Sequence, residues 1–291
     1  MKRVLAWLLV LTLLLPLGGR ASAEEQRPRR AVIGADLTAE QIEEVYRAFG
    51  VSRGTVTELK VSNQEERQYL EGLIEESVIG TRSISCVYVE LREEGGGMSV
   101  STNNISWCTA DMYVNALTTA GITDAKIIVA APFSVSGTAA LTGIYKAYED
   151  MTGETLTDEA KQTGTQELTL TGELAEEIGS EDSTAIINDL KEILEETAAM
   201  SDEELHERIE QIAAGYDVTL TENQVRQLID LCRSLEKLNV GGVISRVEQV
   251  QETIQKVSDA KDKVVSFVDK ARSFFNAVAD FFNQIKSIFG T

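Results

Sequence analysis

Residues 125–148 read AKIIVAAPFSVSGTAALTGIYKAY and contain the junction of a predicted strand with a predicted helix. Apart from Lys126, the run AKIIVAA is continuously apolar, which is typical of a strand covered on both faces. Leu141, Ile144, Tyr145 and Tyr148 then recur at helical spacing, which predicts an amphipathic helix. A strand followed directly by a helix indicates that this part of the chain combines α and β structure.

The turn between that strand and that helix is rich in hydroxyl groups and glycine. Ser134 or Ser136 is placed to cap the helix, because a serine oxygen can accept a hydrogen bond from its first free N–H groups. The same helix end could bind an anion, and the candidate residues are Ser134, Ser136, Gly137 and Thr138. No G-x-S-x-G frame surrounds Ser136 and no lysine completes a phosphate-binding loop. We therefore expect the turn to start a helix, with anion binding as the alternative.

The runs SISCVYVEL and MSVSTNNISWC alternate in hydrophobicity around a Gly-Gly-Gly turn, which predicts a β-hairpin. One register gives it an apolar face, with Val87 opposite Trp107. The same register places Cys86 opposite Cys108, and directly opposed residues lie within reach of a disulfide. We therefore expect a disulfide between Cys86 and Cys108, with two free thiols as the alternative.

The fold class that these patterns predict is α+β. Residues 31–153 are expected to form a mixed α/β sandwich domain with the hairpin, and residues 154–240 an acidic helical region. Capping boxes predict helix starts at Thr38, Ser201 and Thr221. Within the helical region, TQELTLTGEL is predicted to add one short strand.

The C-terminal segment, residues 241–291, follows a heptad pattern and is predicted to be one long amphipathic helix. Its apolar seam begins at Val243, Val247 and Val250 and is typical of a coiled coil. The face then widens with aromatic residues, namely Phe267, Phe274, Phe275, Phe281, Phe282 and Phe289. A helix packed on its own domain or on a partner helix is expected, including self-association into a homo-oligomer. The alternative is a helix that lies on a membrane surface.

The N-terminal segment, residues 1–23, resembles a secretory signal peptide. Lys2 and Arg3 precede an apolar run, and Ala21, Ser22 and Ala23 form a small-residue cleavage site. The run is shorter than the roughly 20 residues of a membrane-spanning helix. We therefore expect a secreted, extracellular protein, in association with the cell envelope if the C-terminal helix attaches it.

The composition argues against nucleic-acid binding and gives no support to metal binding or catalysis. The formal net charge is −20 at pH 7, so nucleic acid is not an expected partner. The single histidine, His206, lies among charged residues, and neither a metal site nor a catalytic triad can be assembled around it. No cofactor motif is present, so we nominate no catalytic residue, no metal ligand and no cofactor.

Several long stretches together resemble a known family. GADLTAEQ, IGTRSIS, VTLTENQVRQLIDL and the stretch from Asn104 to Glu149 are similar to the YpuA-like family of exported proteins from Gram-positive bacteria, which is catalogued as a domain of unknown function. The likeness covers residues 31–240 and leaves out the C-terminal segment. The resemblance implies export and a role outside the membrane, and it assigns no catalytic residue to this chain.

The predicted function is a secreted or envelope-associated interaction protein. In this hypothesis the α/β half is a binding module and residues 241–291 are an attachment helix for a membrane surface or a protein partner. The alternative is an envelope hydrolase or a small-ligand-binding enzyme that uses a cleft in the α/β half. The location of a pocket relative to Asn103, Asn104 and the two serines of the turn separates the two hypotheses.

Overall fold

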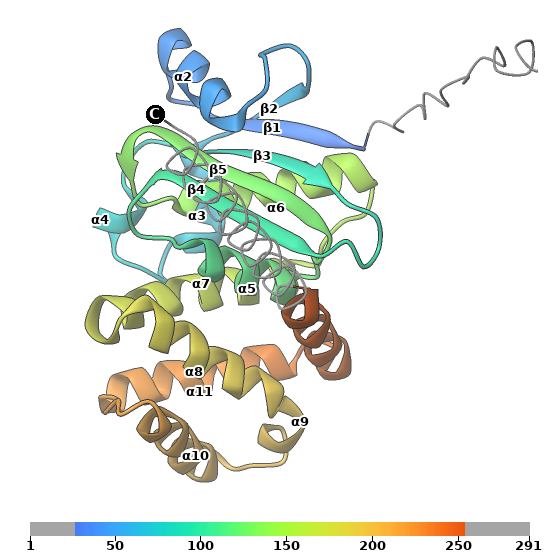
Figure 1. Cartoon of the computed structure of the whole chain (residues 1–291). Coiled ribbons are helices and arrows are strands. Elements are labelled where there is room, and N and C mark those ends of the chain that lie inside the picture. The colour runs from blue at the N-terminus through green and yellow to red at the C-terminus, as the bar shows by residue number, and fades with distance from the viewer. Residues whose placement is uncertain (1–26, 254–291) are drawn as a thin grey trace, which may run out of the picture.

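Five strands form one mixed sheet in the N-terminal half of the protein (Figure 1). The computed structural model describes residues 27–253. The order across the sheet is β2-β1-β3-β5-β4. The strands are β1 (Arg29–Gly34), β2 (Thr57–Val61), β3 (Cys86–Leu91), β4 (Met98–Ile105) and β5 (Ala125–Val135). β3 runs antiparallel to both neighbours, so the other four strands point in one direction and end at the same edge.

Helices cover both faces of this sheet. α2 (Ala39–Phe49) packs on one face, while α5 (Ala110–Ala120) and α6 (Thr138–Thr152) pack on the other. Because side chains alternate along a strand, neighbouring residues of β5 enter different cores: Val129 lies under α5 and α6, and Ala130 lies under α2. This arrangement confirms the α+β class and explains why residues 127–131 are apolar at successive positions, whereas Lys126 near the start of β5 is exposed.

The predicted β-hairpin is wrong. β3 and β4 are not neighbours, because β5 lies between them and pairs with both. In the observed register Cys86 is opposite Ala130, and Val87 is opposite Val129. A largely apolar strand buries more of its surface at this inner position than at an edge of the sheet, since it has a hydrogen-bonded neighbour on each edge and a helix layer on each face.

The predicted disulfide is absent, and Cys86 and Cys108 are free, buried thiols. Cys86 lies in the core beneath α2 together with Tyr88, whereas Cys108 lies in the core of the other face together with Tyr113. The hairpin register was the geometric reason for pairing them, and the insertion of β5 removes that register. The third cysteine, Cys232, is a free thiol buried in the helical region.

A second core belongs to the helical region, which lies beside α5 (Figure 1). The capping boxes predicted at Thr38, Ser201 and Thr221 are present, each with reciprocal hydrogen bonds between the cap and the third helical residue. The helices of the region are α7 (Asp158–Ile178), α8 (Ser180–Glu192), α9 (Leu194–Thr197), α10 (Asp202–Gly215) and α11 (Glu222–Glu236).

The segment TQELTLTGEL is helical, so its prediction as a strand is wrong. It lies inside α7, which packs against α5. At Gly164 an added Cβ would stand 2.6 Å from the backbone oxygen of Ala116, and at Gly172 it would stand 2.4 Å from the ring of Trp107. Threonine and glycine therefore serve close helix packing here, and their β propensity is overridden by tertiary contacts.

The beginning of the heptad segment packs on the protein itself. Residues 240–253 are helical, and Val243, Val247 and Val250 are buried. Val243 and Val247 join the core of the helical region, whereas Val250 joins the core of the α/β half. No helix within residues 27–253 has the length and apolarity needed to cross a membrane.

Two predictions lie outside the described residues. The predicted signal peptide, residues 1–23, falls before them. The six phenylalanines of the predicted aromatic face, Phe267, Phe274, Phe275, Phe281, Phe282 and Phe289, fall after them.

Candidate functional site

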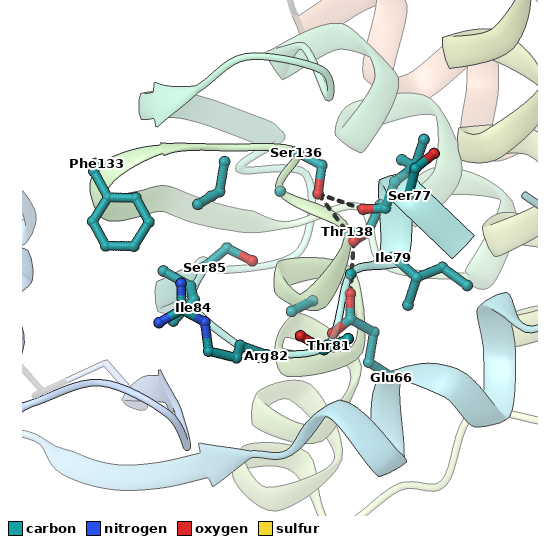
Figure 2. Close-up of a pocket in the computed structure, with 15 residues that line it drawn as sticks. Glu66, Ser77, Ile79, Thr81, Arg82, Ile84, Ser85, Phe133, Ser136 and Thr138 are labelled. Atoms are coloured by element: carbon teal, nitrogen blue, oxygen red, sulfur yellow. Dashed lines mark hydrogen bonds between the residues drawn. The ribbon is translucent and has the colours of Figure 1, made fainter. Parts of the chain in front are cut away.

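A pocket of about 270 Å³ opens at the carboxyl edge of the sheet (Figure 2). Three parts of the chain line it: Glu66 of α3 (Asn63–Leu70), most of the segment 77–85 before β3, and residues from the end of β5 to the start of α6, namely 133 and 135–139. The carboxyl end of a strand next to a helix N-terminus is a common place for ligand sites in α/β sheets. The pocket therefore occupies a position where this kind of fold exposes unpaired backbone groups.

Backbone geometry brings the middle segment close to the sheet. Gly34 ends β1, and a Cβ atom there would stand 2.3 Å from the carbonyl oxygen of Ser83. Asp36 fixes the same turn, because its carboxylate accepts a hydrogen bond of 2.8 Å from the Ser83 N–H. α4 (Glu76–Ile79) precedes this turn and supplies the opposite wall.

Glu66 is the carboxylate of the pocket and is only 1% exposed. Its Oε1 accepts a hydrogen bond of 2.6 Å from the hydroxyl of Thr138, and its Oε2 accepts one of 3.3 Å from Asn63 Nδ2. Figure 2 shows the Thr138 contact as a dashed line that links α3 to the start of α6. The sequence places Glu66 one helical turn before Leu70, which is also buried, and this shared face is the signal that would have found it.

Burial raises the pKa of Glu66 to about 7. The hydrogen bonds from Thr138 and Asn63, and the charge of Arg67, oppose that rise, because each of them favours the ionised form. The balance leaves a carboxyl group that exchanges its proton near neutral pH. Such a group can donate or accept a hydrogen bond towards a ligand.

The predicted serine cap of α6 is wrong, since the cap is Gly137 and no side chain bonds there. Gly137 has φ 103°, in the left-handed region, and an added Cβ would stand 2.6 Å from both Ile105 Cγ2 and Tyr113 Oη. Glycine is required at this point both by its backbone conformation and by the lack of space. The Ser136 hydroxyl instead donates to the Val78 carbonyl at 2.9 Å.

Three of the four anion-binding candidates lie together in the pocket, and the fourth does not. Ser136, Gly137 and Thr138 line it, whereas Ser134 is not among its lining residues. Asn103 and Asn104 are also outside the lining. The carboxyl group of Glu66 contacts the same helix end through Thr138, so an anion bound directly there would face an acidic neighbour.

Arg82 supplies a positive charge to the same pocket. It lines the pocket from an exposed position on the segment that precedes β3. Within residues 27–253 no ion pair joins Arg82 to a carboxylate. Its guanidinium group is therefore available to a ligand, at a different part of the lining from Glu66.

His206 lies elsewhere, in α10 of the helical region. Its Nε2 is 3.6 Å from Glu210 of the same helix, and its side chain is 30% exposed. It is not a lining residue of the pocket at the sheet edge. The hydroxyl groups of Ser136 and Thr138 therefore have no imidazole beside them, and their partners are a carbonyl, a carboxyl group and each other.

Comparisons with known proteins identify a family and no activity. The model of a family described as "Protein of unknown function (DUF1002)" matches residues 33–257. The chain is similar to "Uncharacterized protein YpuA" of Bacillus subtilis (strain 168), with 37% identity over 225 residues, which cover 76% of this chain and 77% of that protein. No solved structure matches the chain. These findings confirm the resemblance to the YpuA-like family.

Proposed function

Because the chain belongs to the family described as a protein of unknown function (DUF1002), which brings no reaction with it, we propose a function from the pocket itself. The protein is an exported binding module that holds a small polar ligand at the carboxyl edge of its sheet. The ligand carries a negatively charged group and one or more hydroxyl groups.

The observation that carries this proposal is the position of Glu66. A carboxyl group is almost never fully buried without a partner or a function, yet Glu66 is 1% exposed and lines an open pocket. Its partners are neutral, Thr138 and Asn63, rather than a lysine or arginine. A ligand hydroxyl can satisfy the remaining hydrogen-bonding capacity of this carboxyl group.

The chemistry of the other lining residues supports a ligand of this class. Ser77, Thr81, Ser85 and Ser136 add hydroxyl groups to the wall, and each can donate or accept. Arg82 offers the planar donor pattern that suits a carboxylate or a phosphate. A polyhydroxylated anion would contact Arg82 with its charged end and Glu66 with a hydroxyl group.

The location and attachment of the protein are part of the same proposal. Lys2 and Arg3, the apolar run after them and the small residues at 21–23 support export. The heptad pattern and the six phenylalanines between 267 and 289 support attachment to a membrane surface or to a protein partner. Because Val243, Val247 and Val250 pack on the protein's own cores, the attaching part begins after residue 253.

The hydrolase alternative has less support. Two carboxyl groups that flank the bond are the usual requirement for glycoside hydrolysis, and Glu66 has no second carboxylate beside it among the described lining residues. A hydroxyl nucleophile needs an adjacent base and access to the substrate. The Ser136 hydroxyl donates to a backbone carbonyl, and the Thr138 hydroxyl, which does donate to Glu66, belongs to a residue that is only 2% exposed. Binding without turnover is therefore the function that the geometry favours.

Titration of the protein with glycerol 3-phosphate tests the proposed pocket. Saturable binding is expected by calorimetry, and inorganic phosphate alone should bind more weakly because it lacks the glycerol hydroxyl groups that would pair with Glu66. Arg82→Gln should weaken the binding by about tenfold or more, the equivalent of one lost charge-assisted contact. Glu66→Gln should also weaken it, while Arg226→Gln, at an exposed arginine of α11, should not. If all three variants bind the ligand with equal affinity, this pocket is not the binding site.

A separate experiment tests the attachment. Removal of residues 254–291 leaves the packed part of the heptad segment in place, so the folded core should be retained. Flotation with phosphatidylglycerol vesicles and sedimentation of the protein alone should then show loss of membrane binding or of self-association. If the shortened chain behaves as the full chain in both assays, the segment is not an attachment helix.

A further inference from the structure

A second cavity, of about 260 Å³, lies where the two halves of the protein meet. α5 of the α/β half, α8 of the helical region and the helix at residues 240–253 form its walls. Figure 1 shows these three helices beside one another at the junction of the two halves. The cavity is separate from the pocket at the sheet edge, since the two share no lining residue.

Three residues that line this cavity each carry one buried polar side-chain atom without a hydrogen-bond partner. These atoms are Asn115 Nδ2 on α5, and Thr184 Oγ1 and Asn188 Oδ1 on α8. Only two other side-chain atoms of residues 27–253 share this property, Ser83 Oγ and Arg208 Nε. Buried polar groups are normally paired because an unpaired one loses its water without compensation. Three such atoms around one cavity therefore indicate a site whose polar partner comes from outside the chain.

A nearby residue shows that the local helices can satisfy polar groups when no external partner is needed. Thr118 lines the same cavity, and its hydroxyl donates to the Val114 carbonyl one turn earlier, at 2.7 Å. Thr184 does not form the equivalent bond. Asn115 is 9% exposed, so its amide is held inside the protein rather than turned towards solvent.

Valine side chains form the apolar part of the cavity wall, which also includes Asp111 and Gln251. Val114 contributes from α5, and Val247 and Val250 contribute from the helix at 240–253. The volume is several times that of one water molecule, about 30 Å³ in the liquid, so the cavity has room for a small organic molecule. A wall of this composition suits an occupant that combines polar groups with an apolar part.

We propose that this cavity is a binding site for a small uncharged amphipathic molecule that carries an amide or a hydroxyl group. Its polar end pairs with Asn115, Thr184 and Asn188, and its apolar end lies against Val247 and Val250. The orientation of an asparagine amide is set by its hydrogen bonds, so the two asparagines can offer donors and acceptors in either arrangement. A ligand with one donor and one acceptor satisfies the site.

Ligand binding at this site is linked to the heptad segment. Two wall residues, Val247 and Val250, begin the apolar seam that continues beyond the described residues. Gln251 also lines the cavity and donates to Glu192 of α8 at 3.2 Å. A ligand that binds only when this helix is docked stabilises the docked state. The site thus connects a small molecule to the base of the segment that we assign to attachment.

N-acetylvalinamide, which has two amide groups and an isopropyl group, is a suitable probe for the full chain. Saturable shifts of the Asn115 and Asn188 side-chain amide resonances are expected in nitrogen–proton NMR spectra. Exchange of the backbone amides at residues 240–253 should slow at saturating probe. Absence of saturable shifts at both asparagines, or shifts without any protection of residues 240–253, would overturn the proposal.

The variant Thr184→Val gives an independent readout. It removes an unpaired hydroxyl without changing the shape of the side chain, so it should raise the thermal midpoint of unfolding while weakening probe binding by about tenfold. Thr171→Val is the matched control, because the Thr171 hydroxyl is buried and donates to the Glu167 carbonyl at 2.6 Å. The control should lower the midpoint. If Thr184→Val also lowers the midpoint, Thr184 is paired and the cavity is not a ligand site.

Discussion

Lys191 Nζ lies 2.8 Å from Glu167 Oε1, and neither side chain is exposed to solvent. Glu167 also accepts a hydrogen bond of 2.5 Å from Thr119, and the Lys191 ammonium reaches the Asn115 carbonyl at 3.4 Å. α8, α7 and α5 are joined at one point by these contacts. The helical region is therefore bound to the α/β half by a buried charge pair as well as by apolar packing.

Replacement of one member of this pair is expected to be costly. Lys191→Met leaves the Glu167 carboxylate buried without its cation, which should reduce the free energy of unfolding by about 3–5 kcal/mol. Urea denaturation of the full chain measures this change. The double variant Lys191→Met, Glu167→Leu removes both charges and should recover most of the loss, since an apolar pair of similar volume is often tolerated. A double variant that is less stable than the single one would contradict this account.

Glu66 should make stability depend on pH. Its pKa is about 7 in the folded protein against an ordinary value of 4.5, so between these values the folded state holds the proton more tightly than the unfolded chain. The free energy of unfolding therefore falls as pH rises through this window, by about 3 kcal/mol in total. Glu66→Gln cannot ionise, so it should match the wild type below pH 4.5 and exceed it above pH 7.

The comparison of variants across pH isolates this effect from the other carboxylates. Urea denaturation of wild type and Glu66→Gln at a series of pH values gives the difference directly. Glu71→Gln, at an exposed residue beside the end of the same helix, should give a difference that stays flat. A flat difference for Glu66→Gln as well would mean that Glu66 is ionised at the same pH in both states.

Local sequence signals predict where helices and strands lie better than they predict which strands pair with each other. The capping boxes at Thr38, Ser201 and Thr221 depend on residues three positions apart, so the sequence contains all of the information. Strand pairing depends on residues far apart, and two alternating runs around a glycine turn gave the wrong neighbour. The apolar run at 125–131 indicates the observed strand order, because a strand buried on both faces belongs inside a sheet, here between the two alternating strands.

The candidate site was predicted only at one of its three segments. Ser136 and Thr138 follow a strand directly, which marks them as residues at the sheet edge. Glu66 belongs to the polar sequence NQEERQYL, which is typical of an exposed helix; its spacing of four from Leu70 is the local sign of a buried face, and the packing of α3 against α6 and α7 completes the burial. Arg82 enters the pocket through a turn without regular structure, and no local pattern predicts where such a turn lies.

All three cysteines should be unreactive thiols in the native protein. Burial raises the pKa of each of Cys86, Cys108 and Cys232 to about 12, and the thiolate is the reactive form. Ellman's reagent should therefore detect no thiol in native protein and three in denaturant without reductant. Detection of a single thiol in denaturant would restore the disulfide between Cys86 and Cys108 that the sequence suggested.

Arg246 should hold the helix at 240–253 in place. Its Nε donates to the Thr118 carbonyl at 2.9 Å and a terminal nitrogen donates to the Thr119 carbonyl at 3.3 Å. Both acceptors lie in the last turn of α5, where free carbonyl groups and the helix dipole favour a positive charge. Burial lowers the pKa of the guanidinium, but an arginine stays charged in proteins. Arg246→Met keeps much of the apolar stem and removes these contacts, at a cost of about 1–3 kcal/mol.

Hydrogen exchange of the backbone amides locates this loss. Arg246→Met should increase exchange at residues 240–253 and leave the amides of β1, β3 and β5 protected, because the sheet does not depend on this contact. Arg226→Met, at an exposed position of α11, should change neither set. Faster exchange across the sheet in Arg246→Met would mean that the helix is part of one cooperative unit with the α/β half. Protection that is unchanged at residues 240–253 would mean that Val243, Val247 and Val250 suffice to dock it.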